Sequence, residues 1–206
     1  MYLSRIMLDA ANRKVMEGFV RPSVFHGAVE RSVGTERQRN LWRIDPFRDS
    51  YCLLLVTPVE PDLSGFAEQF GLWGELPETK NYDAFLGALK AGQRWRFRVK
   101  LNPIKCVDGK RCPVMNRDLK AWFSVKAEAN GFEIRQDDFD ICELRDYCFN
   151  KSGEAFARQS GMVRFKTATF EGILTVTEPD ALRQALSFGI GKEKAYGCGL
   201  LTLARL

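Results

Sequence analysis

The chain has 206 residues, enough for one medium-sized domain or two small ones, and its composition, 45% hydrophobic and 12% aromatic, is that of a globular protein with a buried core. The longest apolar run, residues 51–56, is too short to cross a membrane. Residues 1–9 lack the layout of a signal peptide, so we expect a cytoplasmic protein without a membrane partner.

The net charge of +5 is distributed unevenly along the chain. Residues 90–126 contain eleven Lys or Arg against two Asp, a net charge of +9. Residues 51–89 contain one basic residue against six acidic ones, a net charge of −5. A basic block beside an acidic block is expected of a protein that binds a polyanion with one face.

The first half of the chain predicts the order βαββαβ. Its strands and helices, the first helix beginning at a proline, are expected at residues 2–8, 22–33, 41–44, 51–56, 82–89 and 95–101. An Asp-Pro turn is expected between the second and third strands. This order is that of the ferredoxin-like unit, which many RNA-binding domains share.

The second half of the chain predicts a similar order less regularly. A helix, two extended segments, a helix and a final strand are expected at residues 118–129, 139–148, 162–176, 179–188 and 200–206. We therefore expect an α+β protein of two tandem ferredoxin-like domains, residues 1–116 and residues 117–206. The join is expected near residues 113–117.

The six cysteines show no Cys-x-x-Cys spacing, and the chain has a single histidine, so a metal cluster would lack ligands. We expect free, buried thiols, with disulfides or a metal cluster as the less favoured alternatives. Asp137, Asp138 and Asp140 are interpreted as a solvated turn rather than a metal site. No metal and no cofactor are expected.

His26, the single histidine, lies in the predicted first helix at the edge of the apolar stripe. Ser23 and Glu30 lie on the same polar side, so the imidazole is expected to reach solvent or a groove. An imidazole can give or take a proton near neutral pH, which suits catalysis. The alternative is a surface histidine without a role.

Residues 94–101 alternate between basic and apolar side chains. Because neighbouring residues of a strand point to opposite faces, one face is expected to carry four cations: Arg94, Arg96, Arg98 and Lys100. Solvated faces usually mix charges of both signs, because like charges in a row repel. We therefore predict a phosphate-binding surface rather than an ordinary solvated face.

The glycine-rich segment at residues 189–199 is a second candidate anion site. The residues expected to contribute are Gly189, Gly191, Lys192, Lys194, Gly197 and Gly199. Glycines leave backbone N–H groups open to close approach by an anion. A dinucleotide-binding fingerprint is excluded, because here a helix precedes the glycines and a strand follows them. A tight turn that aligns the last strand is the alternative, and it is compatible with anion binding.

Two further groups of cations are expected to contact the polyanion. Lys105, Lys110 and Arg111 follow the basic strand. The other group lies between and within the two extended segments of the second half, and comprises Lys151, Arg158, Arg164 and Lys166. Arg164 and Lys166 are two residues apart and are expected to share a strand face.

Four segments of the chain carry a resemblance to a known family. They are Met-Tyr-Leu-Ser-Arg-Ile at residues 1–6, Asn-Pro-Ile-Lys at 102–105, Phe-Glu-Gly-Ile-Leu-Thr-Val at 170–176 and the ending at 189–206. Together they resemble the CasE family, the CRISPR precursor-RNA endoribonucleases of the type I-E Cascade complex. The resemblance runs from the first residue to the last, and the glycine-rich ending is its most specific part.

The resemblance implies two tandem ferredoxin-like domains that cut the CRISPR repeat hairpin without metal and retain the product among the other Cascade subunits. Without metal, the ribose 2′-OH attacks the adjacent phosphate, which leaves a 2′,3′-cyclic phosphate and a 5′-OH end. A histidine of the first helix serves the reaction in the family, and His26 matches it. Some relatives place a tyrosine one helical turn earlier, where this chain has Ser23. The second catalytic group is therefore not identified from the sequence.

Two other functions are alternatives to this one. The first is a non-catalytic subunit that binds an RNA hairpin on the same fold, with His26 in a purely structural role. The second is a ferredoxin-like sensor of small molecules, which fits the fold but not the basic block at residues 90–126. RNA binding on an aromatic platform is disfavoured because the sequence lacks an RNP-type motif.

Overall fold

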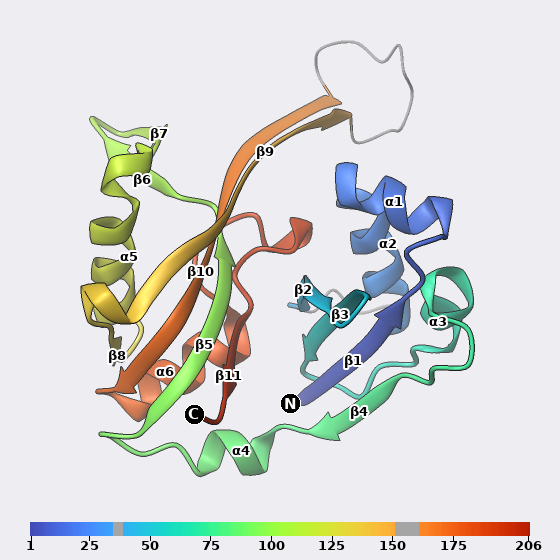
Figure 1. Cartoon of the computed structure of the whole chain (residues 1–206), viewed down its shortest axis with the longest axis horizontal. Helices are drawn as coiled ribbons and strands as arrows, with labels where there is room; N and C mark the ends of the chain where they lie inside the picture. The colour runs from blue at the N-terminus through green and yellow to red at the C-terminus, as the bar shows by residue number, and fades with distance from the viewer. Residues whose placement is uncertain (35–38, 151–160) are drawn as a thin grey trace.

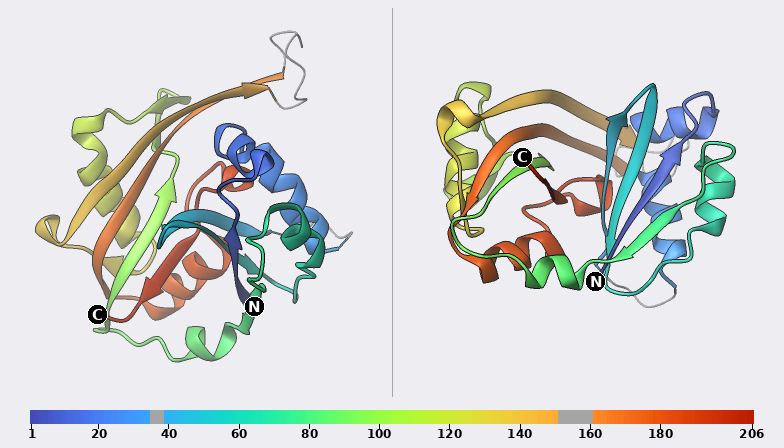
Figure 2. Two further views of the ribbon diagram at one scale, coloured as in Figure 1. Left: turned by 45° about the vertical axis from the view of Figure 1, so that its right-hand side comes forward. Right: turned by 60° about the horizontal axis from the view of Figure 1, so that its bottom comes forward.

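The computed structural model describes residues 1–34, 39–150 and 161–206. Two large antiparallel sheets, each with helices on one face, form its two units, and a two-stranded sheet is added to the second (Figures 1 and 2). The elements of the first unit are β1 (Tyr2–Leu8), α1 (Arg13–Val20), α2 (Ser23–Ser32), β2 (Leu41–Phe47), β3 (Ser50–Thr57), α3 (Ser64–Phe70) and β4 (Glu78–Asn81). Its sheet has the strand order β2-β3-β1-β4. This strand order and the connections between the strands are those of a ferredoxin-like unit.

The second unit repeats the arrangement. Its elements are β5 (Arg94–Leu101), β6 (Ile104–Val107), β7 (Lys110–Pro113), α5 (Leu119–Glu128), β8 (Phe132–Glu133), β9 (Phe139–Asn150), β10 (Met162–Val176), α6 (Pro179–Phe188) and β11 (Leu201–Ala204), with 3-10 turns η1 (Asn116–Asp118), η2 (Gln136–Asp138) and η4 (Lys194–Tyr196). The sheet order is β11-β5-β10-β8, and β9 also pairs with β10. The prediction of two tandem ferredoxin-like units is confirmed.

The helices lie on the outer sides of the two units, so the helix-free faces of the sheets point toward the middle of the molecule (Figure 2, right). In the first unit, Phe25 of α2 packs against Phe66 and Phe70 of α3, and all three are buried. In the second unit, Phe123 of α5 stacks on Phe170 of β10, with ring centroids 4.2 Å apart. The apolar faces of the helices thus form one core per unit.

A helix is present within residues 82–89, as predicted, but its assignment as the second helix of the first unit is wrong. The helix that packs on the first sheet is α3, whereas residues 82–89 contain only the short α4 (Asp83–Gly87), which leads toward the second unit (Figure 1). The segment around α3 is acidic and contains Gly and Pro, so its sequence does not indicate a helix. Only Phe66 and Phe70, one helical turn apart, are buried on α3.

The assignment of residues 95–101 to the first sheet is also wrong. β5 pairs with β10 and β11, and the fourth strand of the first sheet is β4. β4 has four polar residues and lies at the sheet edge, so it shows no apolar alternation. This strand pairing does not fit a division at residue 116, and we propose that the domain boundary lies between β4 and β5.

The two units are joined by a buried arginine. Arg43 of β2 is 1% exposed, and its guanidinium donates to the backbone oxygens of Arg98 and Leu200 at 2.7 and 2.6 Å. It also donates to Thr202 Oγ1 and pairs with Asp45 at 2.6 Å. One side chain of the first unit therefore contacts β5, β11 and the segment before β11.

The remaining predictions about the chain have mixed outcomes. All six cysteines are free thiols, as predicted, but only Cys52 and Cys198 are buried. The turn between β2 and β3 is at residues 48–49, because both strands run further than expected. None of the described helices is long and apolar enough to cross a membrane.

Candidate functional site

His26 lies on α2 and faces the second unit. The buried residues of α2, among them Phe25 and Val29, hold the helix on the first core and leave the His26 side chain 38% exposed. The ring of His26 meets the ring of Tyr196 in η4 edge-on, with centroids 6.5 Å apart. The only histidine is therefore placed where the first unit touches the loop that follows α6.

A carboxylate lies beside the His26 imidazole. Glu30 Oε1 is 3.8 Å from His26 Nδ1, one helical turn along α2. The same oxygen accepts a hydrogen bond from Asn40 Nδ2 at 3.1 Å, and Asn40 is buried. A carboxylate on one ring nitrogen favours the orientation in which the other nitrogen faces outward. Ser23 lies one turn earlier, at the first residue of α2.

The glycine-rich segment packs against β2 of the first unit. A Cβ atom at Gly197 would lie 2.8 Å from the ring of Trp42, and one at Gly189 would lie 2.6 Å from the side chain of Leu41. Both glycines have positive φ angles, of 78° and 74°, which other residues rarely adopt. These two glycines are thus required for close packing, as the tight-turn alternative predicts.

The middle of the same segment is open. Gly191 has no atom near the position of a Cβ, and Lys192 is exposed. Within the described part of the chain, the backbone N–H groups of residues 191–193 donate to no protein oxygen. Lys194 Nζ donates to the Phe188 carbonyl at 2.7 Å, and burial together with the nearby charges of Arg39 and Lys192 lowers its pKa. Three free N–H groups beside these cations form a place for an anion.

The cations of β5 share one face, as predicted, but most are paired. Arg94 lies 3.7 Å from Asp138, and Lys100 lies 3.3 Å from Glu143. Arg98 pairs with Asp45 at 3.1 Å and also with Glu171. The acids come from η2, β2, β9 and β10, which a single strand's sequence does not reveal. Among the described residues only Arg96 of this face has no acidic partner, so the face is not a free cationic surface.

Asp45 is central to this network. Burial alone would raise the pKa of Asp45, but the hydrogen bonds and charge of Arg43, with the nearby charges of Arg98 and Lys100, outweigh burial and lower it. The carboxylate is therefore ionised and holds Arg43 and Arg98 in place. Neither Arg43 nor Asp45 was identified from the sequence, where an Arg-x-Asp in a strand reads as solvent-exposed.

The other predicted cations lie in separate places. Lys105, Lys110 and Arg111 are exposed on the β6–β7 hairpin, and Figure 1 shows β9 and β10 between this hairpin and α2. Arg164 and Lys166 share one face of β10, as predicted, and Lys166 Nζ donates to Asn116 Oδ1 at 2.6 Å. The other predicted cations, Lys151 and Arg158, lie outside the described residues.

An aromatic cluster on the opposite face of β9 and β10 reaches the His26 site. Tyr147 stacks on Phe165, and Phe165 stacks on Tyr196, with centroids 5.0 and 5.5 Å apart. Phe149 meets Tyr196 edge-on at 5.3 Å. Tyr196 therefore links the long β9–β10 hairpin to His26. Its place within the glycine-rich segment was the available sequence signal for this residue.

Comparisons with known sequences match nearly the whole chain to CRISPR-associated proteins. A sequence model of the CRISPR associated protein family matches residues 1–205. The CRISPR-associated endoribonuclease Cse3 of Thermus thermophilus is 32% identical over 228 aligned residues, covering 99% of this chain and 100% of Cse3. The Cascade subunit CasE of Escherichia coli is 33% identical over 132 residues, which cover 57% of this chain and 61% of CasE.

Solved structures agree with the sequence comparisons. A structure of Cse3 bound to a 19-nucleotide RNA has a TM-score of 0.81 to this chain, with 28% identity over 99% of this chain and 100% of the other. Thermus thermophilus Cse3 bound to an RNA that represents a pre-cleavage complex has a TM-score of 0.78, with 28% identity over 98% of each chain. The resemblance stated from the sequence is thereby confirmed. The chain belongs to the CasE family of CRISPR-associated proteins, which includes Cse3.

Proposed function

We propose that this protein is a metal-independent endoribonuclease that binds and cuts the repeat hairpin of CRISPR precursor RNA. The observation that carries the proposal is the contact between the two units, where His26 meets Tyr196 at the edge of the glycine-rich segment. A proton-transfer group then contacts the same glycine-rich segment whose N–H groups at residues 191–193 have no acceptor among the described residues. The similarity to Cse3, an endoribonuclease seen bound to RNA, over nearly the whole chain supports it.

In the proposed reaction, the ribose 2′-OH next to the cut attacks the adjacent phosphorus, and the bond from phosphorus to the 5′ oxygen breaks. The 2′ oxygen loses its proton and the leaving 5′ oxygen gains one. The products are a 2′,3′-cyclic phosphate and a 5′-OH end. His26 gives or takes one of these protons, a role that contributes about 10²–10⁴-fold to the rate.

The other residues hold the reacting groups in place. Glu30 orients the His26 imidazole through Nδ1, and the ring of Tyr196 supports its edge. The N–H groups of residues 191–193 and the charge of Lys192 stabilise the extra negative charge on the phosphate in the transition state. Ser23 has an aliphatic hydroxyl, which is a poor proton donor at neutral pH, so we assign it no proton transfer.

The stem of the hairpin is held through its phosphates, because the major groove of A-form RNA is too narrow for side chains to read. Since most cations of β5 are paired with acids, we propose that the stem contacts the cations that have no carboxylate partner among the described residues, above all Arg164, Lys166 and the exposed cations of the β6–β7 hairpin. After the cut, the protein keeps the hairpin and joins other Cascade subunits in the cytoplasm, as expected for its family.

The test is incubation of the purified protein with its own CRISPR repeat RNA in excess EDTA. The proposal predicts one cut, with a 2′,3′-cyclic phosphate on one product and a 5′-OH on the other, detected by mass spectrometry. Cleavage only after Mg²⁺ is added would contradict the metal-independent reaction. Tight binding without cleavage under both conditions would favour the alternative, a non-catalytic subunit that binds the RNA hairpin.

A further inference from the structure

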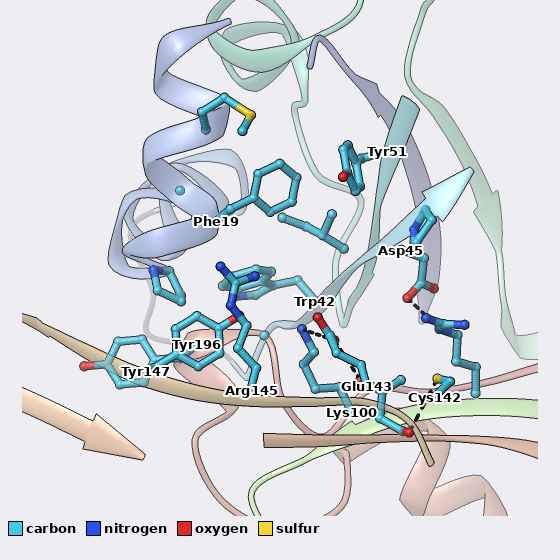
Figure 3. Close-up of a pocket in the computed structure, with 18 residues that line it drawn as sticks. Phe19, Trp42, Asp45, Tyr51, Lys100, Cys142, Glu143, Arg145, Tyr147 and Tyr196 are labelled. Carbon is cyan, nitrogen blue, oxygen red and sulfur yellow. Dashed lines mark hydrogen bonds and ion pairs between the residues drawn. The ribbon is translucent and has the colours of Figure 1, made fainter. Parts of the chain in front are cut away.

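A cleft of about 460 Å³ lies between the two units, and the reaction proposed above does not use it. One wall comes from α1, β2 and β3, and the other from β5, β9 and η4 (Figure 3). The volume falls within the roughly 300–1,000 Å³ of sites that hold a small molecule or one residue of a polymer. Its lining combines aromatic rings with charged side chains, as Figure 3 shows.

The charges that line the cleft leave one cation uncompensated. Arg98 is paired with Asp45 at 3.1 Å, and Lys100 is paired with Glu143 at 3.3 Å. The remaining cation is Arg145 of β9. Among the described residues no carboxylate lies within ion-pair distance of it, and its guanidinium lies 5.0 Å from the centre of the Tyr147 ring. The cleft therefore offers one positive charge to an anionic group.

The aromatic residues of the cleft are only partly covered. Phe19 and Tyr51 on the first wall, with ring centroids 4.6 Å apart, and Tyr196 on the second wall are each half-buried. Aromatic rings beside an arginine bind unpaired nucleotides, because a base stacks on the ring while the phosphate meets the cation. A base within a duplex is already stacked and does not enter such a cleft.

The cleft adjoins the His26 site. Tyr196 contacts His26 and also lines the cleft. Pro22, the residue before α2, lines the cleft as well. An RNA strand with its reacting phosphate at His26 thus needs to continue only past Tyr196 to reach Arg145. This continuity favours RNA over a protein segment as the occupant of the cleft.

We propose that the cleft binds one unpaired nucleotide of the repeat RNA beside the cut, with its phosphate at Arg145 and its base against the rings of Phe19 and Tyr51. This inference rests on the proposed function and adds a requirement to it: the hairpin must carry an unpaired flank. The flank then anchors the strand that leaves the stem and keeps the reacting phosphate at His26.

The experiment compares two RNAs, the full repeat and the same hairpin trimmed of its unpaired flanks. Both carry a 2′-deoxy sugar at the cut so that they remain intact. Arg145→Gln should lower the slope of log affinity against log salt by about 0.7 on the full repeat and leave it unchanged on the trimmed hairpin. Tyr51→Leu, which keeps an apolar side chain, should weaken binding of the full repeat about fivefold.

The matched control is Arg135→Gln, because Arg135 is exposed between β8 and η2 and does not line the cleft. Unchanged affinity for the trimmed hairpin shows that each variant is folded. Equal loss of affinity on both RNAs, or no loss on either, would overturn the inference. So would an Arg145→Gln variant that binds both RNAs normally but no longer assembles with Cascade subunits, because a protein segment would then occupy the cleft. Failure of the proposed function is separate, since it appears as absent cleavage of unmodified repeat RNA.

Discussion

The imidazole of His26 meets side chains that come from both units. Glu30 belongs to the same helix, whereas Tyr196 belongs to the segment that follows α6. The ring of Tyr196 is itself fixed by Phe149 and Phe165 of the β9–β10 hairpin. The position of His26 therefore depends on aromatic packing that originates in the second unit.

Tyr196→Ala should slow cleavage about tenfold or more at saturating protein, because a displaced catalytic group loses rate steeply with distance. Affinity for the hairpin should change less than about threefold, since Tyr196 carries no charge to a phosphate. Tyr196→Phe keeps the ring and should retain nearly the full rate. Single-turnover rates and binding curves for the three proteins check this. A Phe variant as slow as the Ala variant would show that the hydroxyl, rather than the ring, matters.

Among the elements, β10 carries the free charges that we assign to the RNA stem. Arg164→Glu with Lys166→Glu should weaken hairpin binding far more than it slows cutting at saturating protein. Each lost phosphate contact should lower the slope of log affinity against log salt by about 0.7–0.9. The control reverses two exposed acids of the first unit, Glu68→Lys with Glu75→Lys, and should leave affinity nearly unchanged. Wild-type affinity and salt slope in the β10 variant would show that the stem lies elsewhere.

The elements also show where sequence patterns predict structure well and where they do not. β1, α2 and α6 were expected close to their observed places, because each has a periodic apolar face that packs on a core. β4 and α3 were missed because an edge strand and a two-turn helix bury few side chains. Because β4 and α3 were not predicted, β5 was assigned to the first sheet instead of the second.

The candidate site follows the same rule. His26 and the glycine-rich segment were proposed as site residues from residue type, because the chemistry of an imidazole and of backbone N–H groups is local. The ion pairs that Arg98 and Lys100 each form with acidic side chains were not predictable, since those acids lie on other strands. The contact between His26 and Tyr196 spans 170 residues of sequence and depends on the relative placement of the units.

In the molecule as a whole, Arg43 and Asp45 fix the two units against each other. Arg43→Met should destabilise the protein by about 3–5 kcal/mol, because it leaves the buried Asp45 without its main partner. Arg43→Met combined with Asp45→Leu should cost less than the single change. Chemical denaturation of the three proteins at pH 7 measures these differences.

The same pair gives a pH dependence with a defined sign. The pKa of Asp45 is lower in the folded protein than its ordinary value, so its contribution to stability is present above that ordinary value, near pH 4, and is lost as pH falls through the lowered pKa. The stability difference between wild type and Arg43→Met should therefore narrow below about pH 4. An equal difference at pH 7 and at pH 3 would mean that Asp45 does not hold Arg43 through its charge.

The central claim is that the ribose of the RNA, with His26 as proton-transfer group and no metal, cuts the repeat. The most direct measurement is cleavage in excess EDTA of two repeat RNAs that differ by one oxygen atom. The account predicts that the unmodified repeat is cut, whereas the repeat with a 2′-deoxy sugar just upstream of the cut binds with similar affinity and stays intact. Cleavage of the deoxy repeat would show that water, rather than the 2′-OH, attacks, and would contradict the mechanism.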